Sequence, residues 1–219
     1  MIATIQTGFS QKFGIPRQSG LAKSITGKII FEKEFRDPKY IEGLEEFDYI
    51  WLLWNFSANE ENDGATVRPP KLGGQKRMGV FATRAPYRPN NIGMSSVKIE
   101  DITMDEKLGP VITVSGVDML DGTPIYDIKP YLPYADSHPE ARGGFADDVK
   151  KEMEVEIPEQ IKKHLNPGML TAIIEILCQD PRPAYDMNKK RSFKLSYDKY
   201  NIVFEQNGEK LLVKTVEKL

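Results

Sequence analysis

The stretch "FDYIWLLWNF", residues 47–56, is the strongest strand signal in the chain. It is short and almost wholly aromatic and aliphatic, a composition that favours a strand covered on both faces. The stretch "SSVKIEDIT", residues 95–103, instead alternates apolar and polar side chains, as a strand with one buried face does. These two segments predict a fold built on β-strands.

Similar segments extend outward from this pair over the first two thirds of the chain. Further candidate strands are residues 2–9, 26–32, 78–83, 110–118 and 124–129. They are short and are bounded by Gly, Pro, Asn or Asp. They do not alternate with ten-residue helical patterns, which argues against a doubly wound parallel sheet. Many short strands with few helices favour a barrel or a sandwich.

The last third of the chain has a different pattern. Residues 138–150 are polar and contain a Gly-Gly pair, so we interpret them as a linker between domains at 1–137 and 151–219. Two segments with Pro at a predicted first helical position follow, at 158–165 and 167–180. Strand-like segments at 192–198, 200–206 and 210–217 close the chain, with a hairpin signal at Asn207-Gly208. We therefore expect a small C-terminal α+β domain.

Composition excludes several classes of protein. The 219 residues include one cysteine and two histidines, which excludes an internal disulfide framework and disfavours a metal site. No apolar run is long enough to span a bilayer, and the N-terminus lacks a secretory signal pattern. The net charge of −2 argues against a general nucleic-acid binder. We expect a cytoplasmic protein without metal and without membrane association.

The charge is nevertheless unevenly distributed. Between Asp63 and Glu100 there is no acidic residue, whereas the interval carries seven basic ones: Arg68, Lys71, Lys76, Arg77, Arg84, Arg88 and Lys98. Pro86 and Pro89 stiffen the backbone around two of these arginines. A chance cluster of basic side chains on a solvated loop is one interpretation, and an anion-binding site is the one we favour.

Four loop-like segments are richer in charged, Pro and Gly residues than a simple turn of the chain requires: residues 14–21, 79–96, 119–137 and 179–186. In the third, Ile125, Asp127 and Lys129 should share one face of a short strand. Asp127 beside Lys129 is either a tuned base or a structural ion pair, and the ion pair is favoured by default. The glycine-rich phosphate loops and the nucleophile elbow are absent. The residues alone indicate a β-rich binder of an anion or nucleotide.

Six motifs, in this order, carry a resemblance to a known family. They are "PRQSGL", "GLEEFDYIWLLWNFS", "RPPKLGG", "GVFATRAPYRPNNIGMSSV", "DGTPIYDIKPYLPYADS" and "QDPRPAY". Together they resemble the TrmO (TsaA-like) family of tRNA N6-methyltransferases over nearly the whole chain. The resemblance implies S-adenosylmethionine-dependent methylation of N6 of threonylcarbamoyladenosine at position 37 of tRNA. It also implies a β-barrel methyl-donor domain, a homodimer, and a C-terminal domain that carries "QDPRPAY".

The resemblance also assigns residues. It implies donor contacts from Pro16, Arg17, Gln18, Phe56, Ser57, Arg84, Met94, Asp121, Gly122 and Thr123. Many relatives have His where Ser57 stands, so no imidazole role is expected at that position. We expect contacts with the tRNA substrate from Lys71, Lys76, Arg77, Arg88, Asn90, Lys129, Arg182 and Tyr185. Asp127 is the candidate general base.

Physical chemistry limits what these side chains can contact. A methyl group on a sulfonium is cationic, so aromatic faces such as Phe56 suit it and arginines do not. The arginines belong at carboxylates or phosphates. Two alternatives remain open: a non-catalytic S-adenosylmethionine- or RNA-binding regulator on the same barrel, and a methyltransferase that acts on a small molecule. We further expect residues 1–137 to fold alone and to bind the donor.

Overall fold

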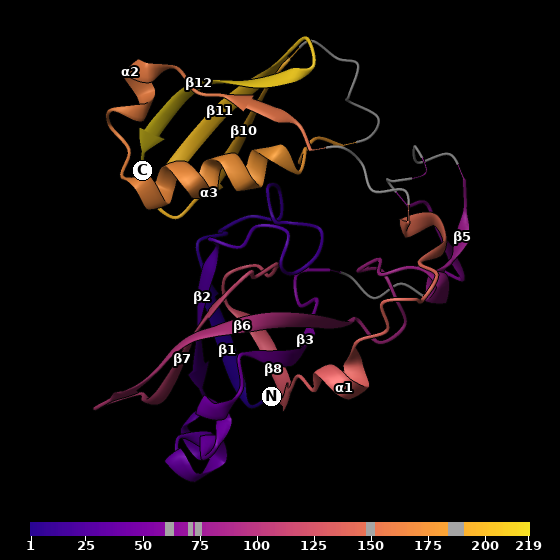
Figure 1. Ribbon diagram of the computed structural model, residues 1–219, viewed down its shortest axis with the longest axis vertical. Helices are drawn as coiled ribbons and strands as arrows, with labels where there is room; N and C mark the ends of the chain where they lie inside the picture. Colours follow the sequence, from indigo (N-terminus) through magenta and orange to yellow (C-terminus); the bar gives the residue numbers. More distant parts are fainter. Residues whose placement is uncertain (60–63, 70–71, 73–75, 148–151, 184–190) are drawn as a thin grey trace.

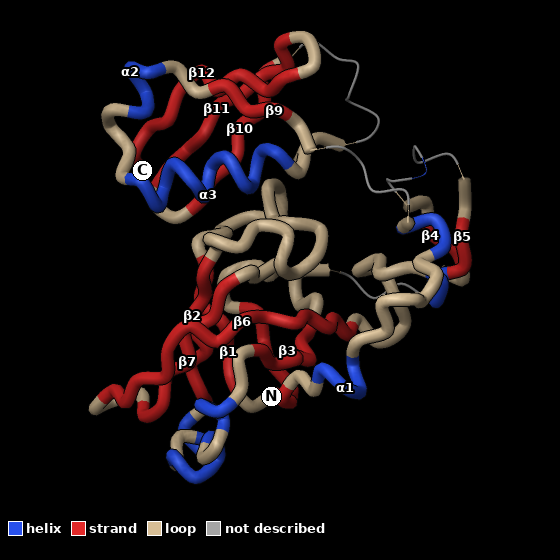
Figure 2. Tube along the Cα trace, in the orientation of Figure 1, coloured by secondary structure: helices blue, strands red, loops and turns tan. Residues whose placement is uncertain are grey.

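The computed structural model describes residues 1–59, 64–69, 72, 76–147, 152–183 and 191–219. Figures 1 and 2 show two bodies, a β-barrel and a smaller sheet with a helix across it, with the loop after β1 between them. The prediction of a mainly β fold with a barrel and a small α+β part is confirmed.

The barrel is closed, and its strands follow one another in the order β1-β2-β7-β6-β3-β8. Every neighbouring pair is antiparallel. The strands are β1 (Ala3–Thr7), β2 (Thr26–Phe31), β3 (Tyr49–Asn55), β6 (Ile92–Asp105), β7 (Gly109–Ser115) and β8 (Thr123–Pro130). A short separate ribbon pairs β4 (Thr66–Val67) with β5 (Met78–Gly79). Single-turn 3-10 helices lie at Lys33–Phe35, Pro38–Ile41, Leu44–Glu46, Val80–Ala82 and Gly144–Ala146, and α1 spans Pro133–Asp136.

Strand β3 shows how the barrel core forms. Ile50, Leu52 and Trp54 point inward and are buried, because alternate side chains of a strand lie on one face. On the outer face Trp51 and Leu53 are only half-buried. The expectation that residues 47–56 are covered on both faces is therefore wrong, and apolar side chains remain on the outside of the barrel.

The predicted strand at 78–83 is also wrong beyond its first two residues. After β5 the chain turns through a 3-10 helix at Val80–Ala82, and the backbone N–H of Thr83 donates to the Val80 carbonyl over 3.1 Å. The Thr83 hydroxyl donates to the same oxygen over 2.9 Å. Val80 is buried, so an apolar residue that anchors a turn looks like part of a strand in the sequence.

A register shift in β8 overturns the expected common face of Ile125, Asp127 and Lys129. Ile125 pairs with Trp54 and is fully buried, whereas Asp127 pairs with Leu53 on the outer face. Opposite the step from Leu53 to Trp54, β8 contains one extra residue, which has no partner on β3. Beyond this bulge, the side chains that were expected to point inward point outward. Asp127 and Lys129 lie together on the outside of the barrel.

The C-terminal sheet has the order β10-β11-β12-β9. Its strands are β9 (Glu154–Glu156), β10 (Ser192–Tyr197), β11 (Tyr200–Asn207) and β12 (Lys210–Lys218), and its helices are α2 (Glu159–Lys162) and α3 (Pro167–Cys178). The Asn166 side chain caps α3 by accepting from the Met169 N–H over 2.8 Å. Strand β9, which pairs parallel to β12, was not predicted, because three residues with two glutamates carry no strand signal.

The 8–25 loop, between β1 and β2, lies between the barrel and the C-terminal sheet (Figure 1). The Phe13 ring stacks on Phe193 and Phe204, with centroids 6.3 and 6.4 Å apart. The Asp198 N–H donates to the Gly8 carbonyl over 2.7 Å. At the far end of the loop, the Ser24 N–H and hydroxyl both donate to one Glu175 oxygen over 2.7 Å. The buried side chains of both bodies form one continuous apolar cluster.

Candidate functional site

Four segments that are far apart in the sequence meet at one end of the barrel. They are the 8–25 loop, the end of β3 with residues 56–59, the 83–91 loop, and the start of β6. The Arg84 guanidinium donates to the Gln18 side-chain oxygen over 2.6 Å, which joins the first segment to the third. The Lys12 ammonium donates to the Ala58 carbonyl, which joins the first to the second. The structure therefore gathers most of the predicted donor-binding positions.

The 83–91 loop is held by its own polar groups. The Arg88 guanidinium donates to the Thr83 carbonyl over 2.9 Å, across the width of the loop. Asn91 has a φ of 36° and is 9% exposed, and its amide nitrogen is oriented to donate to the Arg88 carbonyl over 2.8 Å. Arg88, predicted to contact substrate, thus braces this loop, while the exposed Arg84 extends from it.

Aromatic side chains form the apolar part of the site. The Trp54 and Phe56 rings lie with centroids 4.2 Å apart, and the Phe56 N–H donates to the Asn91 carbonyl over 2.8 Å. A Cβ on Gly93 would collide with the Trp54 ring, so only glycine allows β6 to approach the ring this closely. Met94, next along β6, is 50% exposed, and Ser57 is exposed at the end of the segment.

The turn at residues 121–123 is tied to β1. The Asp121 carboxylate accepts from the Thr7 N–H over 2.9 Å, and the Gly122 N–H donates to the Ile5 carbonyl over 2.9 Å. Gly122 has a φ of 74°, which the turn requires. The Thr123 hydroxyl is buried and donates to the Leu120 carbonyl over 2.7 Å. The side chains of Asp121 and Thr123 stabilise the turn, so its backbone N–H and C=O groups are the ones that can contact a ligand.

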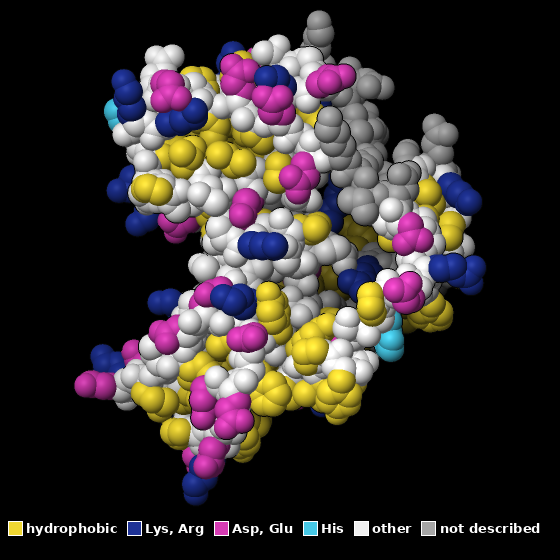
Figure 3. Space-filling model, in the orientation of Figure 1, with side chains coloured by type: hydrophobic (Ala, Val, Ile, Leu, Met, Phe, Trp, Pro, Cys, Tyr) yellow, Lys and Arg dark blue, Asp and Glu magenta, His cyan; other side chains and the backbone are white. Residues whose placement is uncertain are grey.

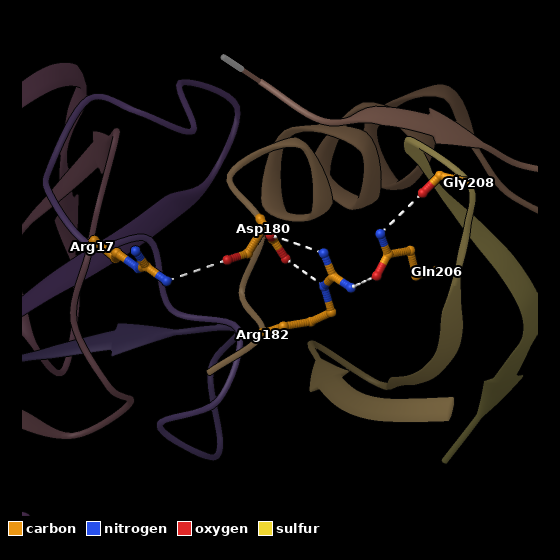
Figure 4. A network of polar contacts seen from close by, with 5 residues as sticks. All are labelled: Arg17, Asp180, Arg182, Gln206 and Gly208. Atoms are coloured by element: carbon orange, nitrogen blue, oxygen red, sulfur yellow. Dashed lines mark hydrogen bonds and ion pairs between the residues drawn. The ribbon is translucent and has the colours of Figure 1, made fainter. Parts of the chain in front are cut away.

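The predicted donor residues in the 8–25 loop differ in exposure. Pro16 is buried, Gln18 is half-buried and Arg17 is exposed. The Arg17 guanidinium reaches the C-terminal body, where it donates to the Asp180 carbonyl over 3.4 Å (Figure 4). The same region holds a cavity of about 200 Å³ lined by the loop and by Ile176, Gln179 and Pro181.

Arg182 does not face a tRNA phosphate, contrary to the prediction. Its side chain is 3% exposed, and its guanidinium donates to the Asp180 carboxylate over 2.7 Å and to the Gln206 oxygen over 2.6 Å. Figure 4 shows these contacts in a line that continues to Arg17. The Arg182 side chain, between two prolines in the sequence, is turned inward, where it joins the end of α3 to β11.

The other predicted substrate residues are not brought to one place. Lys76 and Asn90 are exposed, and the Arg77 guanidinium donates to the Thr66 hydroxyl over 2.9 Å across the β4–β5 ribbon. The Lys129 ammonium lies 2.9 Å from the Asp127 carboxylate, so the ion pair favoured from the sequence is present. Lys71 and Tyr185 lie outside the described residues.

Asp118 is the charged residue of this region that sequence reasoning missed. It follows β7, and its carboxylate accepts from the Ser95 hydroxyl over 2.6 Å. Burial raises its pKa to about 6, although the hydrogen bonds from Ser95 and the Ser19 N–H and the charge of Arg84 oppose the shift. The available signal was a lone acid at the end of the apolar run "PVITVSGVD", which was interpreted only as the end of a strand.

Two general properties of the described residues complete the description. None of the helices resolved there is both long and apolar enough to cross a bilayer. No group of three or more His, Cys, Asp or Glu side chains lies close enough together to hold a metal ion among the described residues. The site described above contains arginines, aromatic rings, backbone groups and the carboxylates of Asp118 and Asp121.

Comparison with known proteins gives consistent matches over both bodies. Residues 4–137 match the family model described as the tRNA-methyltransferase O N-terminal domain, and residues 148–219 match the TrmO C-terminal domain. The chain is similar to the tRNA (adenine(37)-N6)-methyltransferase of Escherichia coli, at 41% identity over 192 residues that cover 84% of this chain and 81% of that protein.

A second relative and a solved structure agree. A protein of Pseudomonas aeruginosa, whose name refers to S-adenosylmethionine-dependent methyl transfer, is 42% identical over 192 residues, with 84% of this chain and 81% of that protein covered. The crystal structure of TrmO from Pseudomonas aeruginosa superposes with a TM-score of 0.79 at 32% identity, covering 99% of this chain and 95% of the other.

Proposed function

The chain belongs to the TrmO family of tRNA methyltransferases, and from this we infer that it is an S-adenosylmethionine-dependent tRNA (adenine37-N6)-methyltransferase. We propose that its substrate adenosine carries a threonylcarbamoyl group. The observation that supports a methyl-donor site is that four separate segments converge around Arg84, Gln18 and Phe56 at one end of the barrel.

The convergence suits the methyl donor, which supplies an electrophilic methyl group on a positively charged sulfur. Arg84 is exposed and already placed by Gln18, so its guanidinium can bind the carboxylate of the donor. Phe56, packed on Trp54, offers an aromatic face to the positive sulfur. Met94 and the backbone of the 121–123 turn complete the apolar and polar sides. Pro16, Arg17, Ser57 and Thr123 remain in the proposed site.

Asp127 remains the proposed general base. It is separated from Met94 by Leu53 on β3, and strands lie about 4.8 Å apart, so Asp127 is roughly 10 Å from Met94 on the outer wall. The Lys129 ammonium is the counter-ion of this carboxylate, 2.9 Å away. A nucleotide laid across β3 would reach both the methyl group and the carboxylate.

The tRNA is proposed to bind along the basic interval between Asp63 and Glu100. Lys76 and Arg77 are exposed there, and Asn90 is exposed at the tip of the 83–91 loop. Lys71 and Tyr185 are included in this proposal from the sequence alone. The division into a methyl-donor domain at 1–137, a linker at 138–150 and a C-terminal domain at 151–219 belongs to the same proposal.

We further propose that the protein is a cytoplasmic homodimer. Large apolar side chains lie exposed around the site and over the barrel, namely Tyr49, Phe81, Tyr87, Ile92, Met94 and Tyr134. Figure 3 shows exposed hydrophobic side chains on this face of both bodies, several of them over the barrel. Exposed large apolar side chains favour burial against a second copy of the chain.

The decisive experiment compares two forms of one tRNA. The full chain is incubated with methyl-labelled S-adenosylmethionine and a tRNA whose position 37 carries threonylcarbamoyladenosine, and separately with the same tRNA carrying unmodified adenosine. We expect label only in the first reaction, in a nucleoside heavier by one methyl group on digestion and mass spectrometry. Equal labelling of both forms would refute the proposed substrate, and binding of donor without any labelling would favour a regulator.

A further inference from the structure

Asp180 follows α3 in a backbone conformation that few residues adopt. Its φ is 49°, in the left-handed region, and its N–H donates to the Leu177 carbonyl over 2.9 Å. Aspartate and asparagine tolerate this region better than most other residues with a side chain. The Arg182 guanidinium donates to both Asp180 carboxylate oxygens, over 2.7 and 3.1 Å, and the two side chains are 3% and 15% exposed. This bidentate ion pair stabilises the Asp180 backbone and so fixes the direction of its carbonyl group.

The Asp180–Arg182 pair is anchored in the C-terminal body. The Arg182 guanidinium donates to the Gln206 side-chain oxygen over 2.6 Å. The Gln206 amide in turn donates to the Gly208 carbonyl over 3.0 Å, in the turn between β11 and β12. Figure 4 shows these groups in one line from Gly208 to Asp180. Groups on α3 and on the β11–β12 hairpin therefore hold the Asp180 carbonyl.

This carbonyl faces the 8–25 loop of the methyl-donor site. It accepts from the guanidinium of the exposed Arg17 over 3.4 Å (Figure 4). The neighbouring Gln18 donates its side-chain amide to the Arg17 carbonyl, and its side-chain oxygen accepts from the Arg84 guanidinium over 2.6 Å. Hydrogen bonds therefore lead from the C-terminal body to Arg84, the residue proposed above to bind the carboxylate of the donor.

We propose that Asp180 is a positioning residue of the methyl-donor site: its carbonyl orients Arg17 and, through the adjoining Gln18, keeps Arg84 in place for the donor. The proposal rests on the function inferred above. Asp180 belongs to the motif "QDPRPAY", from which the sequence predicted tRNA contacts, and here it serves donor binding instead. It acts through Arg17 rather than on the donor, because its carboxylate is bound by Arg182.

Donor affinity depends on this chain of contacts because Arg17 and Arg84 are both exposed. A long exposed side chain adopts many rotamers, and binding a ligand then costs the conformational freedom that the side chain loses. A guanidinium that is already oriented loses less of this freedom when it binds a carboxylate. Removing the restraint at Asp180 should therefore weaken donor binding.

The test measures binding of S-adenosylhomocysteine by calorimetry for the full chain and for two variants, Asp180→Ala and Asp180→Asn. Both variants lose the charge that pairs with Arg182, but asparagine retains the left-handed backbone and a side-chain oxygen that accepts from Arg182. We expect Asp180→Ala to bind about ten-fold more weakly, and Asp180→Asn to stay within about three-fold of the unchanged chain. Equal losses in the two variants, or full affinity of Asp180→Ala, would overturn the proposal.

A second pair of variants leaves the buried ion pair in place. Arg17 and Gln206 are exposed, so Arg17→Ala and Gln206→Ala should fold, and each should weaken binding about three- to five-fold. The double variant should bind no more weakly than the weaker single variant, because both residues act through Asp180. Asn207→Ala, which removes an exposed amide beside Gln206, is the control and should bind normally. Additive losses, or normal binding by Gln206→Ala, would contradict the proposal, whereas no binding by the unchanged chain would refute the proposed function.

Discussion

At the scale of single residues, the register shift in β8 places Asp127 and Lys129 on the outer wall of the barrel, apart from Ile125. The pair is exposed on the outer wall, with 46% of the Asp127 side chain and 63% of the Lys129 side chain accessible. An exposed pair contributes about 1 kcal/mol or less to stability, so the carboxylate is free to serve another purpose at little cost.

We predict that Asp127→Asn lowers kcat by about a hundred-fold or more, the usual contribution of a general base, and leaves donor affinity unchanged. Single-turnover methylation of the modified tRNA measures the first quantity and calorimetry the second. Asp101→Asn, an exposed carboxamide substitution on β6 outside the site, is the matched control. A change in kcat smaller than about three-fold would exclude Asp127 as the base, whose usual contribution is far larger.

Arg182 belongs to the interior, so its substitution should affect stability before it affects tRNA. Removing one partner of a buried ion pair typically costs about 3–5 kcal/mol, and Arg182→Ala also leaves Gln206 without its donor. We predict that Arg182→Ala lowers the free energy of unfolding by about 3 kcal/mol, measured in urea. Lys210→Ala, which breaks an exposed pair with Glu154, should cost less than about 1 kcal/mol. Equal costs would show that the Arg182 network does not support the fold.

Elements were predicted from the sequence where short runs rich in β-branched and aromatic residues are bounded by Gly, Pro, Asn or Asp. Residues 26–32, 110–118 and 192–198 yielded strands for this reason, which does not depend on the pairing partners. The bulge in β8 and the three-residue β9 were missed, since both depend on pairing with another strand. The site residues came largely from family resemblance, and Asp118 was missed because its hydrogen-bond donor, the Ser95 hydroxyl, is brought to it only by folding.

The contact of β6 with β3 allows a prediction at the scale of elements. A methyl group at position 93 would collide with the Trp54 ring, and overpacking of a buried site costs about 1–3 kcal/mol. We therefore predict that Gly93→Ala lowers the free energy of unfolding by that amount and weakens donor binding, because Trp54 supports Phe56. Gly79→Ala is the control, since Gly79 has ordinary backbone angles and open space around it. Unchanged stability of Gly93→Ala would show that the ring can move aside.

At the scale of the whole molecule, the proposed tRNA-binding role of the basic interval can be tested apart from donor binding. The salt slope of binding falls by about 0.7–0.9 for each phosphate that the protein no longer neutralises. We predict that Lys76→Ala/Arg77→Ala weakens tRNA binding and flattens its dependence on salt, while S-adenosylhomocysteine affinity stays the same. Affinities measured across a salt series for both proteins test this prediction. Parallel salt dependences would show that these residues do not touch phosphates.

The shared core changes the expectation that residues 1–137 bind the donor alone. Without the C-terminal body, Phe13 loses both of its stacking partners and Ser24 loses Glu175. Ordering one residue on binding costs about 1–2 kcal/mol, so a released 8–25 loop should weaken donor affinity at least about ten-fold. We predict this loss for the 1–137 fragment, measured by calorimetry after circular dichroism has confirmed its strands. A folded fragment with full affinity would restore the original expectation.

The position of the 8–25 loop between the two bodies also fixes when, during synthesis, the protein becomes competent. When the ribosome has synthesised the whole barrel, it has not yet synthesised Phe193 and Phe204, on which Phe13 packs. The 8–25 loop is therefore synthesised early, but the strands that hold it in place are synthesised much later. A nascent chain should therefore bind the methyl donor weakly, and full affinity should appear only once both bodies have folded.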